Sequence, residues 1–312
     1  MKRQLSSLAL ICAMALPAAA ASLGTNSRAA IPADVQQVIS ADYRAMRNSE
    51  TAMALKQRVL PENLKQFETS LRALGISPER DMEQLTFAAY RPTSAKGLRS
   101  VGIATGTFQT KQILAKLRAK KIRGEKYRRS FIYPSGAGLL FTFLDENTML
   151  FGENAAVKDA IDARDGEIQN LNSNSQMTEM ISAVESGPVW SVLDQLGTQN
   201  MMRSALGDAA GLADYDAVKK RLVASRYTVD FSRGVNFDLD VVTSDTMTAA
   251  TLSSLIKAGM MYKKMNSTPI EKAALESMSV DSNSGRLSMH FKSDDKKFQS
   301  LMQSDLFAAV SR

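Results

Sequence analysis

Residues 226–242, RYTVDFSRGVNFDLDVV, contain the clearest structural pattern in the chain. From Val235 onward, the apolar side chains Val, Phe, Leu and Val alternate with Asn, Asp and Asp. A period of two residues is typical of a strand with one buried and one solvated face. The turn at 232–234 separates this strand from a second β-rich run, 226–231, and the two runs together predict a hairpin. The fold is therefore expected to contain an antiparallel sheet.

Outward from this hairpin, the same order of elements is predicted twice along the chain. In the second half, a strand (189–193) and helical stretches (198–222) precede the hairpin, and a helix (247–265), two strands (277–281, 286–292) and a helix (296–306) follow it. In the first half, the order is an extended segment (35–43), a helical region (49–74) interrupted at Pro61, strands (85–90, 98–105), a helix (110–121), strands (126–133, 139–144, 148–151) and a helix (155–163). Two such series predict an α+β fold of two similar, ferredoxin-like units, with antiparallel sheets and helices on one face.

The boundary between the two units is expected at 166–176. This segment includes the polar, turn-rich run Asn-Leu-Asn-Ser-Asn-Ser-Gln at 170–176, which is typical of a linker. The two units then comprise residues 32–168 and 177–312. The small and polar residues 22–31 are expected to form a flexible lead-in.

The first 21 residues have the pattern of a removable signal peptide. Lys2-Arg3 is followed by a run at 5–16 that is apolar except for two serines, then by Pro17 and four alanines at 18–21. The run is shorter than the roughly 20 residues that a membrane span needs, although an uncleaved membrane anchor is the alternative. No other segment approaches 18 apolar residues. We therefore expect a periplasmic or secreted protein with no transmembrane segment in the mature chain.

The only cysteine, Cys12, lies inside this expected signal peptide. The mature chain would then have no cysteine, so its stability would come from an apolar core and not from a disulfide. The whole chain has a formal charge of +7, and removal of Lys2 and Arg3 leaves +5.

Five short motifs resemble those of a loose group of exported bacterial proteins of unknown function. They are Ile31-Pro-Ala-Asp-Val35, Gly106-Thr-Phe108, Phe131-Ile-Tyr133, Phe143-Leu-Asp145 and Phe151-Gly-Glu153. The resemblance covers most of the mature chain and implies export and a mixed α/β structure. It implies no particular reaction.

The single histidine, His290, restricts the chemistry that the chain can perform. One imidazole without cysteines cannot form a histidine- or cysteine-rich zinc site. As a general base, His290 would also need a nucleophile and an orienting carboxylate. Asp294 and Asp295 follow it, but they are expected to cap the next helix. A structural histidine is the favoured interpretation.

Two carboxylates, Asp238 and Asp240, project from the same face of one strand, roughly 7 Å apart. Such a pair is compatible with a glycosidase or a divalent-cation site. Because the alternate residues are apolar, the favoured interpretation is the solvated face of a one-sided sheet.

Two further patterns bear on the chemistry of the chain. Ser254-Leu-Ile-Lys257 matches the S-x-x-K motif of penicillin-recognising enzymes, but its partner motifs are absent. The abundant methionines, including Met260, Met261 and Met265, are expected to fill the core and not to bind copper. We therefore expect no metal and no cofactor.

One stretch, 111–129, carries an unusual concentration of positive charge. Nine basic residues, Lys111, Lys116, Arg118, Lys120, Lys121, Arg123, Lys126, Arg128 and Arg129, are opposed only by Glu125, which gives nine minus one, or +8. The rest of the mature chain then has a charge of +5 minus +8, or −3. Such a stretch is typical of a surface for an anionic partner, although a merely solvated helix face is the alternative. The eight basic residues from Lys116 onward are the candidate binding residues.

These observations favour an exported envelope protein that binds or scaffolds and is not an enzyme. The expected partner is a lipid head group, an acidic glycan or an acidic protein. Tyr127 is the only aromatic residue in the stretch, which argues against nucleic acid. The alternatives are a carboxylate-dependent hydrolase of envelope glycans and a carrier that holds an apolar ligand between the two units.

Overall fold

The computed structural model describes residues 22–92, 97–136, 138–206 and 215–310. The expected signal peptide, 1–21, lies outside the described residues. In the described part, no helix is both long enough and apolar enough to cross a membrane.

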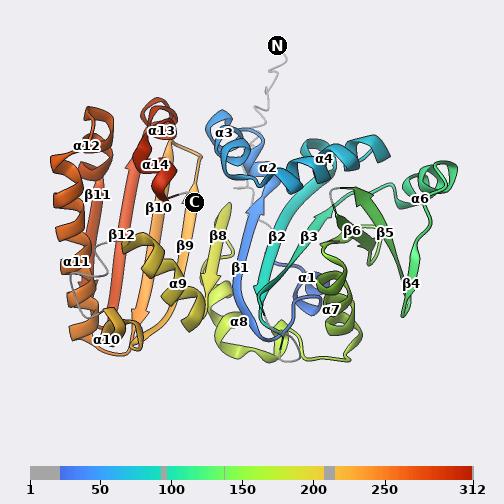
Figure 1. Ribbon diagram of the computed structural model, residues 1–312, viewed down its shortest axis with the longest axis horizontal. Helices are drawn as coiled ribbons and strands as arrows, with labels where there is room; N and C mark the ends of the chain where they lie inside the picture. Colours follow the sequence, from blue (N-terminus) through green and yellow to red (C-terminus); the bar gives the residue numbers. More distant parts are fainter. Residues whose placement is uncertain (1–21, 93–96, 137, 207–214, 311–312) are drawn as a thin grey trace, which may run out of the picture.

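Twelve strands form one continuous antiparallel sheet, in the order β11-β12-β10-β9-β8-β1-β2-β3-β7-β6-β5-β4 (Figure 1). The strands are β1 (Val35–Asp42), β2 (Met82–Tyr90), β3 (Arg99–Gly106), β4 (Glu125–Tyr127), β5 (Ser130–Gly136), β6 (Leu139–Phe143), β7 (Thr148–Gly152), β8 (Val189–Leu193), β9 (Leu222–Asp230), β10 (Val235–Thr243), β11 (Met278–Asn283) and β12 (Arg286–Ser293). The hairpin predicted at 226–242 is β9–β10, in which Leu239 is opposite Tyr227. The predicted α+β class with antiparallel pairing is confirmed.

The centre of the sheet differs from the expected arrangement of two separate units. The first strand of each half, β1 and β8, pair with each other, with Ile39 opposite Ser191, so that the two halves share one sheet. From this junction the order is β1-β2-β3-β7-β6 in one direction and β8-β9-β10-β12-β11 in the other. In each half the first three strands are neighbours in chain order, and the third strand then pairs with a later one, β3 with β7 and β10 with β12. This refines the expected ferredoxin-like order, because that order sets the first and third strands side by side. Superposition of the two halves stays a prediction.

Helices pack against both faces of the N-terminal half of the sheet. The helices are α1 (Thr25–Ala29), α2 (Tyr43–Met46), α3 (Glu50–Val59), α4 (Glu62–Leu74), α5 (Pro78–Asp81), α6 (Thr110–Ala119), α7 (Asn154–Asp165), α8 (Ser175–Ser182), α9 (Gln195–Leu206), α10 (Tyr215–Lys219), α11 (Thr246–Met265), α12 (Pro269–Glu276), α13 (Asp295–Leu301) and α14 (Asp305–Val310), with a short 3₁₀ turn at Leu171–Ser173. Val101 and Ile103 of β3 pack with Val157 and Ile161 of α7. Ala104, which points to the other face, packs in the cluster that includes α4 and α6.

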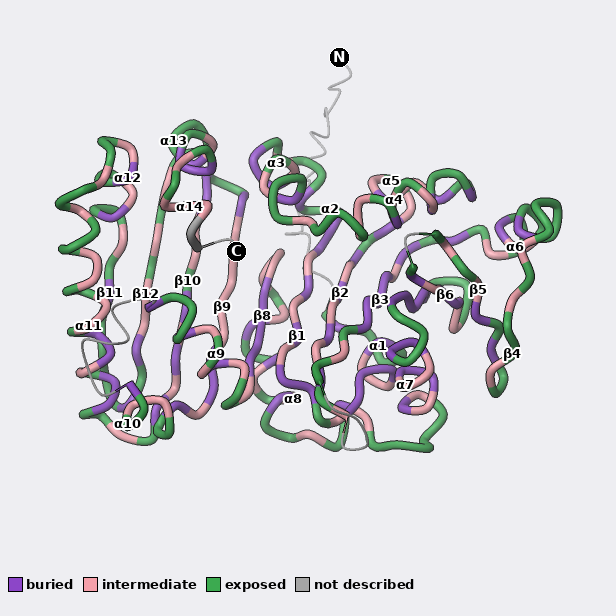
Figure 2. Tube along the Cα trace, viewed as in Figure 1, coloured by how far each residue is buried: buried purple, intermediate pink, exposed green. Residues whose placement is uncertain are grey.

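The C-terminal half of the sheet has a buried and a solvated face, as the alternation in 235–242 predicts. Leu239 and Val241 pack with Leu252 of α11, while Asp238 on the opposite face is 57% exposed. The burial pattern along the chain is visible in Figure 2.

The expected flexible lead-in at 22–31 is wrong. These residues contain α1, and the side chains of Leu23 and Ile31 are 3% and 0% exposed within the main apolar cluster. Arg28 forms an ion pair with Glu185 at 2.7 Å, which further fixes the segment. The high alanine content obscured two large apolar residues that the core requires.

The polar run at 170–176 is also packed against the rest of the protein. The Leu171 amide donates to the carbonyl of Ile31 at 2.8 Å, and the Asn174 side chain donates to the carbonyl of Ala33 at 2.8 Å. Asn170 and Asn174 cap the 3₁₀ turn and α8, accepting from the amides of residues two and three positions later. The asparagines that suggested a linker are therefore helix caps.

The cap of α11 predicts a pH effect. Asp245 accepts hydrogen bonds from the amide and the hydroxyl of Thr248, at 2.8 and 2.9 Å, and these lower the pKa of its carboxyl to about 2. Because the folded-state pKa is depressed, the stabilisation is present above the ordinary value of 3.8 and is lost as the pH falls through about 2. We expect the stability difference between the protein and Asp245→Asn to disappear over this range in thermal unfolding. A constant difference would contradict the assignment.

Candidate anion-binding surface

The basic stretch forms one end of the molecule, where α6 continues into the edge strand β4 (Figure 1). All nine basic side chains are exposed, whereas Ile113 and Leu117 are 2% and 0% exposed against the apolar core. The stretch is therefore an amphipathic helix followed by a charged edge. Charged residues on an edge strand also discourage pairing with other chains, which gives Lys126 a role in solubility.

Two of the eight candidate residues lie against the end of α4. Lys120 donates from Nζ to the carbonyl of Ala73 at 3.3 Å. The Lys116 ammonium lies beside Gly75, which ends α4 with φ of +92°, and a methyl group at Gly75 would overlap Lys116 Nζ. Since the carbonyl end of a helix is electronegative, both lysines stabilise the contact between α4 and α6.

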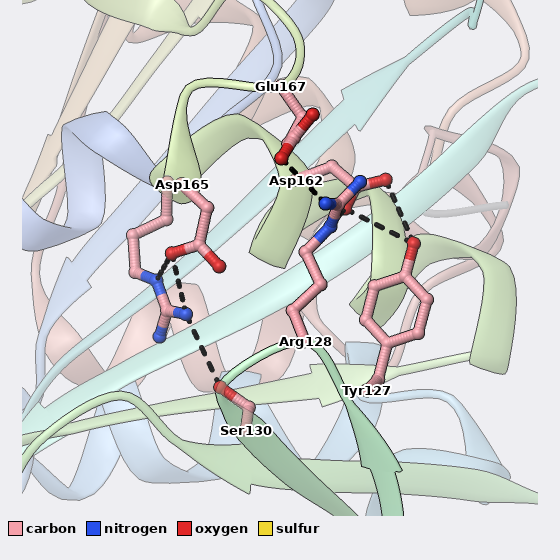
Figure 3. A network of polar contacts seen from close by, with 7 residues as sticks. Tyr127, Arg128, Ser130, Asp162, Asp165 and Glu167 are labelled. Carbon is pink, nitrogen blue, oxygen red and sulfur yellow. Dashed lines mark hydrogen bonds and ion pairs between the residues drawn. The ribbon is translucent and has the colours of Figure 1, made fainter.

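Arg128 is held in a network of acidic partners (Figure 3). Its guanidinium binds Asp162 and also Glu167, the latter at 2.6 Å, and the Asp162 hydrogen bond raises the pKa of Arg128. The Tyr127 hydroxyl donates to the same Asp162 at 2.9 Å, and partial burial and this contact raise the tyrosine pKa. The charge of Arg128 is thus compensated, and the side chain joins β4 to α7.

The remaining five candidate residues form what we call the free basic cluster: Arg118, Lys121, Arg123, Lys126 and Arg129. Each is exposed, and none forms an ion pair with any residue in the described part of the chain. Glu125, the one acidic residue in the stretch, pairs with Lys158 at 2.8 Å. Arg129 is close enough to Asp165 to help Arg164 lower the pKa of that carboxyl, but the cluster as a whole presents positive charge without direct ion pairs in the described part of the chain.

Two basic residues of this surface have a left-handed backbone. Lys121 has φ of 57° and Arg128 has φ of 48°, and Ser284 is the only other non-glycine residue in the described part with positive φ. This conformation costs a residue with a side chain roughly 1–2 kcal/mol and is usually occupied by glycine. Residues in such backbone conformations cluster at active sites and ligand-binding sites, where the surrounding structure holds them in place.

A cavity of about 260 Å³ lies at the beginning of α6, next to this surface. Its lining includes Lys116, Arg80, Gln109 and Gln112, and a single carboxylate, Asp81, which Arg80 pairs with at 2.6 Å. Sequence reasoning missed Arg80, Gln109 and Gln112, because they carry no motif and only the tertiary fold brings them to the same cavity as Lys116.

The structure brings together two residues that the sequence left apart. His290 and Asp238 are directly opposite on β12 and β10, and His290 Nδ1 lies 2.5 Å from Asp238 Oδ1. Both side chains are more than half exposed, at 55% and 57%. Cross-strand register, which sequence alone does not give, creates this pair.

Asp240, the other carboxylate of the expected pair, is engaged by three neighbours. It lies 3.1 Å from Arg226 and 3.5 Å from Arg286, and it accepts from the Ser288 hydroxyl at 2.8 Å. Asp238 and Asp240 thus belong to cross-strand polar ladders. Among the described residues, no three or more His, Cys, Asp or Glu side chains gather closely enough to hold a metal ion.

No protein-family model matches the chain, and no curated protein sequence does. Three solved structures of TP0453 have a similar fold. Crystal form I has a TM-score of 0.49 at 7% identity and covers 88% of this chain and 95% of its own. Crystal form III has a TM-score of 0.47 at 8% identity and covers 88% of this chain and 96% of its own. Crystal form IV has a TM-score of 0.48 at 9% identity and covers 89% of this chain and 96% of its own. At these identities the likeness concerns the fold alone.

Proposed function

We propose that this protein acts by binding an anionic partner at the free basic cluster and not by catalysis. The observation that carries the proposal is Lys121, a basic residue in a left-handed conformation where glycine would be less costly. It lies among other exposed and unpaired cations. A surface that served only for solubility would not need a charged side chain at that position.

The proposal includes export and duplication. The first 21 residues would be removed as a signal peptide, and the protein would act in the periplasm or outside the cell. The two halves of the sheet would be two copies of one ancestral unit. In that compartment, the partner would be a lipid head group, an acidic glycan or an acidic protein surface.

Electrostatic attraction supports the proposal because the cluster lies at one end of the molecule, where an extended partner has access. Several like charges on one surface raise the local concentration of an anionic partner and accelerate association. The cavity beside Lys116 and Arg80 adds a recess next to the charged surface. A partner with one protruding anionic group would fit this combination.

The direct test is binding as a function of salt. We expect the protein to sediment with vesicles containing phosphatidylglycerol, or to bind an acidic polysaccharide, at low ionic strength. Binding should weaken steeply as the screening length falls from about 30 Å at 0.01 M to about 8 Å at 0.15 M. Vesicles of phosphatidylcholine alone and a neutral polysaccharide serve as controls. Equal binding to charged and neutral surfaces would refute the proposal.

The backbone at Lys121 gives a second prediction. Lys121→Gly and Lys121→Ala both remove the ammonium, but only the alanine variant keeps a side chain at positive φ. We expect the glycine variant to be more stable than the alanine variant by about 1 kcal/mol in urea unfolding. Both variants should bind the anionic surface equally weakly. A glycine variant that binds like the unmodified protein would show that the lysine side chain is not required.

A further inference from the structure

Another cavity lies in the C-terminal half of the protein, at the end of the sheet where α12 and α13 are found (Figure 1). Its volume is about 230 Å³. Its lining comes from α12, from the end of β12, from α13 and from the turn between β9 and β10. The lining includes no residue of the basic stretch 111–129, all of which the structure describes. The cavity is therefore separate from the free basic cluster.

Part of this cavity is apolar. Ile270, Ala273 and Ala274 line it from one face of α12, because residues three and four positions apart lie on the same side of a helix. Leu301 of α13 also lines it, and this side chain is buried in the apolar cluster against which Ala274 packs. An apolar group placed here would be removed from water, which is favourable.

Three basic side chains, Arg233, Lys292 and Lys297, line the same cavity. Lys297 pairs with Asp294, the single carboxylate of the lining, at 3.3 Å. Asp294 also caps α13 by accepting from the Lys297 amide at 2.9 Å, and this hydrogen bond lowers the pKa of its carboxyl. Within the described residues, Arg233 and Lys292 have no ion pair and no side-chain hydrogen bond. The lining thus has a charge of three minus one, or +2.

The walls of the cavity are fixed by contacts other than those of Arg233 and Lys292. Gly234 has φ of +78°, and a methyl group there would overlap the carbonyl oxygen of Ser293, so the turn packs directly on the end of β12. Glu271 of α12 is buried and accepts from the Leu306 amide at 2.9 Å, which joins α12 to the beginning of α14. The cavity is therefore formed before a ligand binds, as is usual for small-molecule sites.

We propose that this cavity binds a small organic anion with a short apolar tail. Arg233 and Lys292 bind the charged head, because they are the cations of the lining that lack a protein partner. The tail lies against the apolar side chains of α12 and α13. The cavity is smaller than the ~300–1,000 Å³ of typical ligand pockets, so the ligand is smaller than a drug-sized molecule.

A ligand with only one of these two parts fits the lining less well. A neutral apolar molecule would cover Arg233 and Lys292 without supplying a counter-charge, which is unfavourable. An inorganic anion would leave Ile270 and Leu301 without an apolar contact. A molecule with both parts matches the whole lining. Its head is a carboxylate or a phosphate ester, since both accept hydrogen bonds from a guanidinium.

Titration with two probes tests the site and identifies the head. Hexanoate and hexyl phosphate have the same tail and different heads, and we expect at least one of them to shift the methyl resonance of Ile270 in the full-length protein. Hexanol, which lacks the charge, should bind about tenfold more weakly or worse. Acetate, which lacks the tail, should also bind about tenfold more weakly or worse. The proposal is wrong if neither probe shifts Ile270, or if hexanol or acetate binds as tightly as the better probe.

Variants on each part of the lining provide a second readout. Arg233→Gln/Lys292→Gln should weaken binding of the better probe about tenfold or more, whereas Lys263→Gln/Lys272→Gln removes the same charge outside the lining and should not. Both pairs are exposed, so thermal unfolding should be unchanged.

Ala273→Leu fills the apolar part of the cavity and should also abolish binding, whereas Ala250→Leu, the same change at an exposed position of α11, should not. Substitutions in the free basic cluster should leave binding unchanged, because the two sites share no residue. If the cavity variants bind like their controls, or if the cluster substitutions abolish binding, the probe binds elsewhere and the proposal is overturned.

Discussion

Replacing Glu68 by glutamine is expected to lower the free energy of unfolding by about 3–5 kcal/mol, because it leaves a buried ammonium without its counter-charge. Lys56 of α3 is only 6% exposed, and its Nζ lies 2.6 Å from Glu68 Oε1 of α4. The same ammonium donates to the hydroxyl of Tyr43, which in turn donates to Glu68 at 3.2 Å. These three residues join α2, α3 and α4 above the sheet.

Tyr43 adds an effect at alkaline pH. Burial, and then the nearby Glu68 carboxylate, raise the pKa of its hydroxyl far above the ordinary value of 10.0. Since the folded-state pKa is raised, this stabilisation is complete below pH 10 and is lost as the pH rises towards the folded-state value. Tyr43→Phe should therefore flatten the loss of stability above pH 10 in thermal unfolding.

Urea unfolding distinguishes a buried pair from an ordinary ion pair. The double variant Lys56→Met/Glu68→Leu, which replaces both charges by apolar groups, should recover most of the stability that Glu68→Gln loses. Arg80→Ala is the exposed control, since Arg80 is 72% exposed in its pair with Asp81, and it should destabilise the protein far less than Glu68→Gln does. If Glu68→Gln costs no more than Arg80→Ala, water reaches the Lys56–Glu68 pair.

Much of the secondary structure follows from local patterns. Alternation in 235–242 predicted a one-sided strand, and β10 has that form because Leu239 and Val241 bury against α11. Pro61 interrupted the helical region as expected, since α3 ends at Val59 and α4 begins at Glu62. These elements were predictable because residues close in sequence determine them.

Contacts between distant segments were not predictable in this way. The junction of β1 with β8 pairs residues about 150 positions apart, and no local pattern specifies it. The same holds for His290 and Asp238, which a register shift of one residue would separate. The basic stretch was identified from charge alone. Which of its residues contact α4 (Lys116 and Lys120), which one binds the acidic residues near α7 (Arg128) and which remain in the free basic cluster depends on the packing of these helices.

Charge reversal of the free basic cluster is expected to abolish anionic binding without unfolding the protein. The substitutions Lys121→Glu, Arg123→Glu, Lys126→Glu and Arg129→Glu change the local charge by −8 and cancel the +8 of the stretch. Each basic residue near an anionic membrane contributes about 1 kcal/mol, so removing four charges alone weakens vesicle binding roughly 1,000-fold. Arg128, Lys116 and Lys120 are kept, because they hold α7 and α4 in place.

A matched variant separates local attraction from net charge. Arg203→Glu, Lys220→Glu, Lys272→Glu and Lys296→Glu also change the charge by −8, at exposed positions in the C-terminal half of the chain. If binding depends on the cluster, this control retains most of its affinity for phosphatidylglycerol vesicles at low salt, whereas the cluster variant does not sediment with them. Exposed substitutions typically shift stability by only about 0.5 kcal/mol each, so both variants should fold. An equal loss of binding in the two variants would mean that the overall charge attracts the partner, and the basic cluster would then have no specific role.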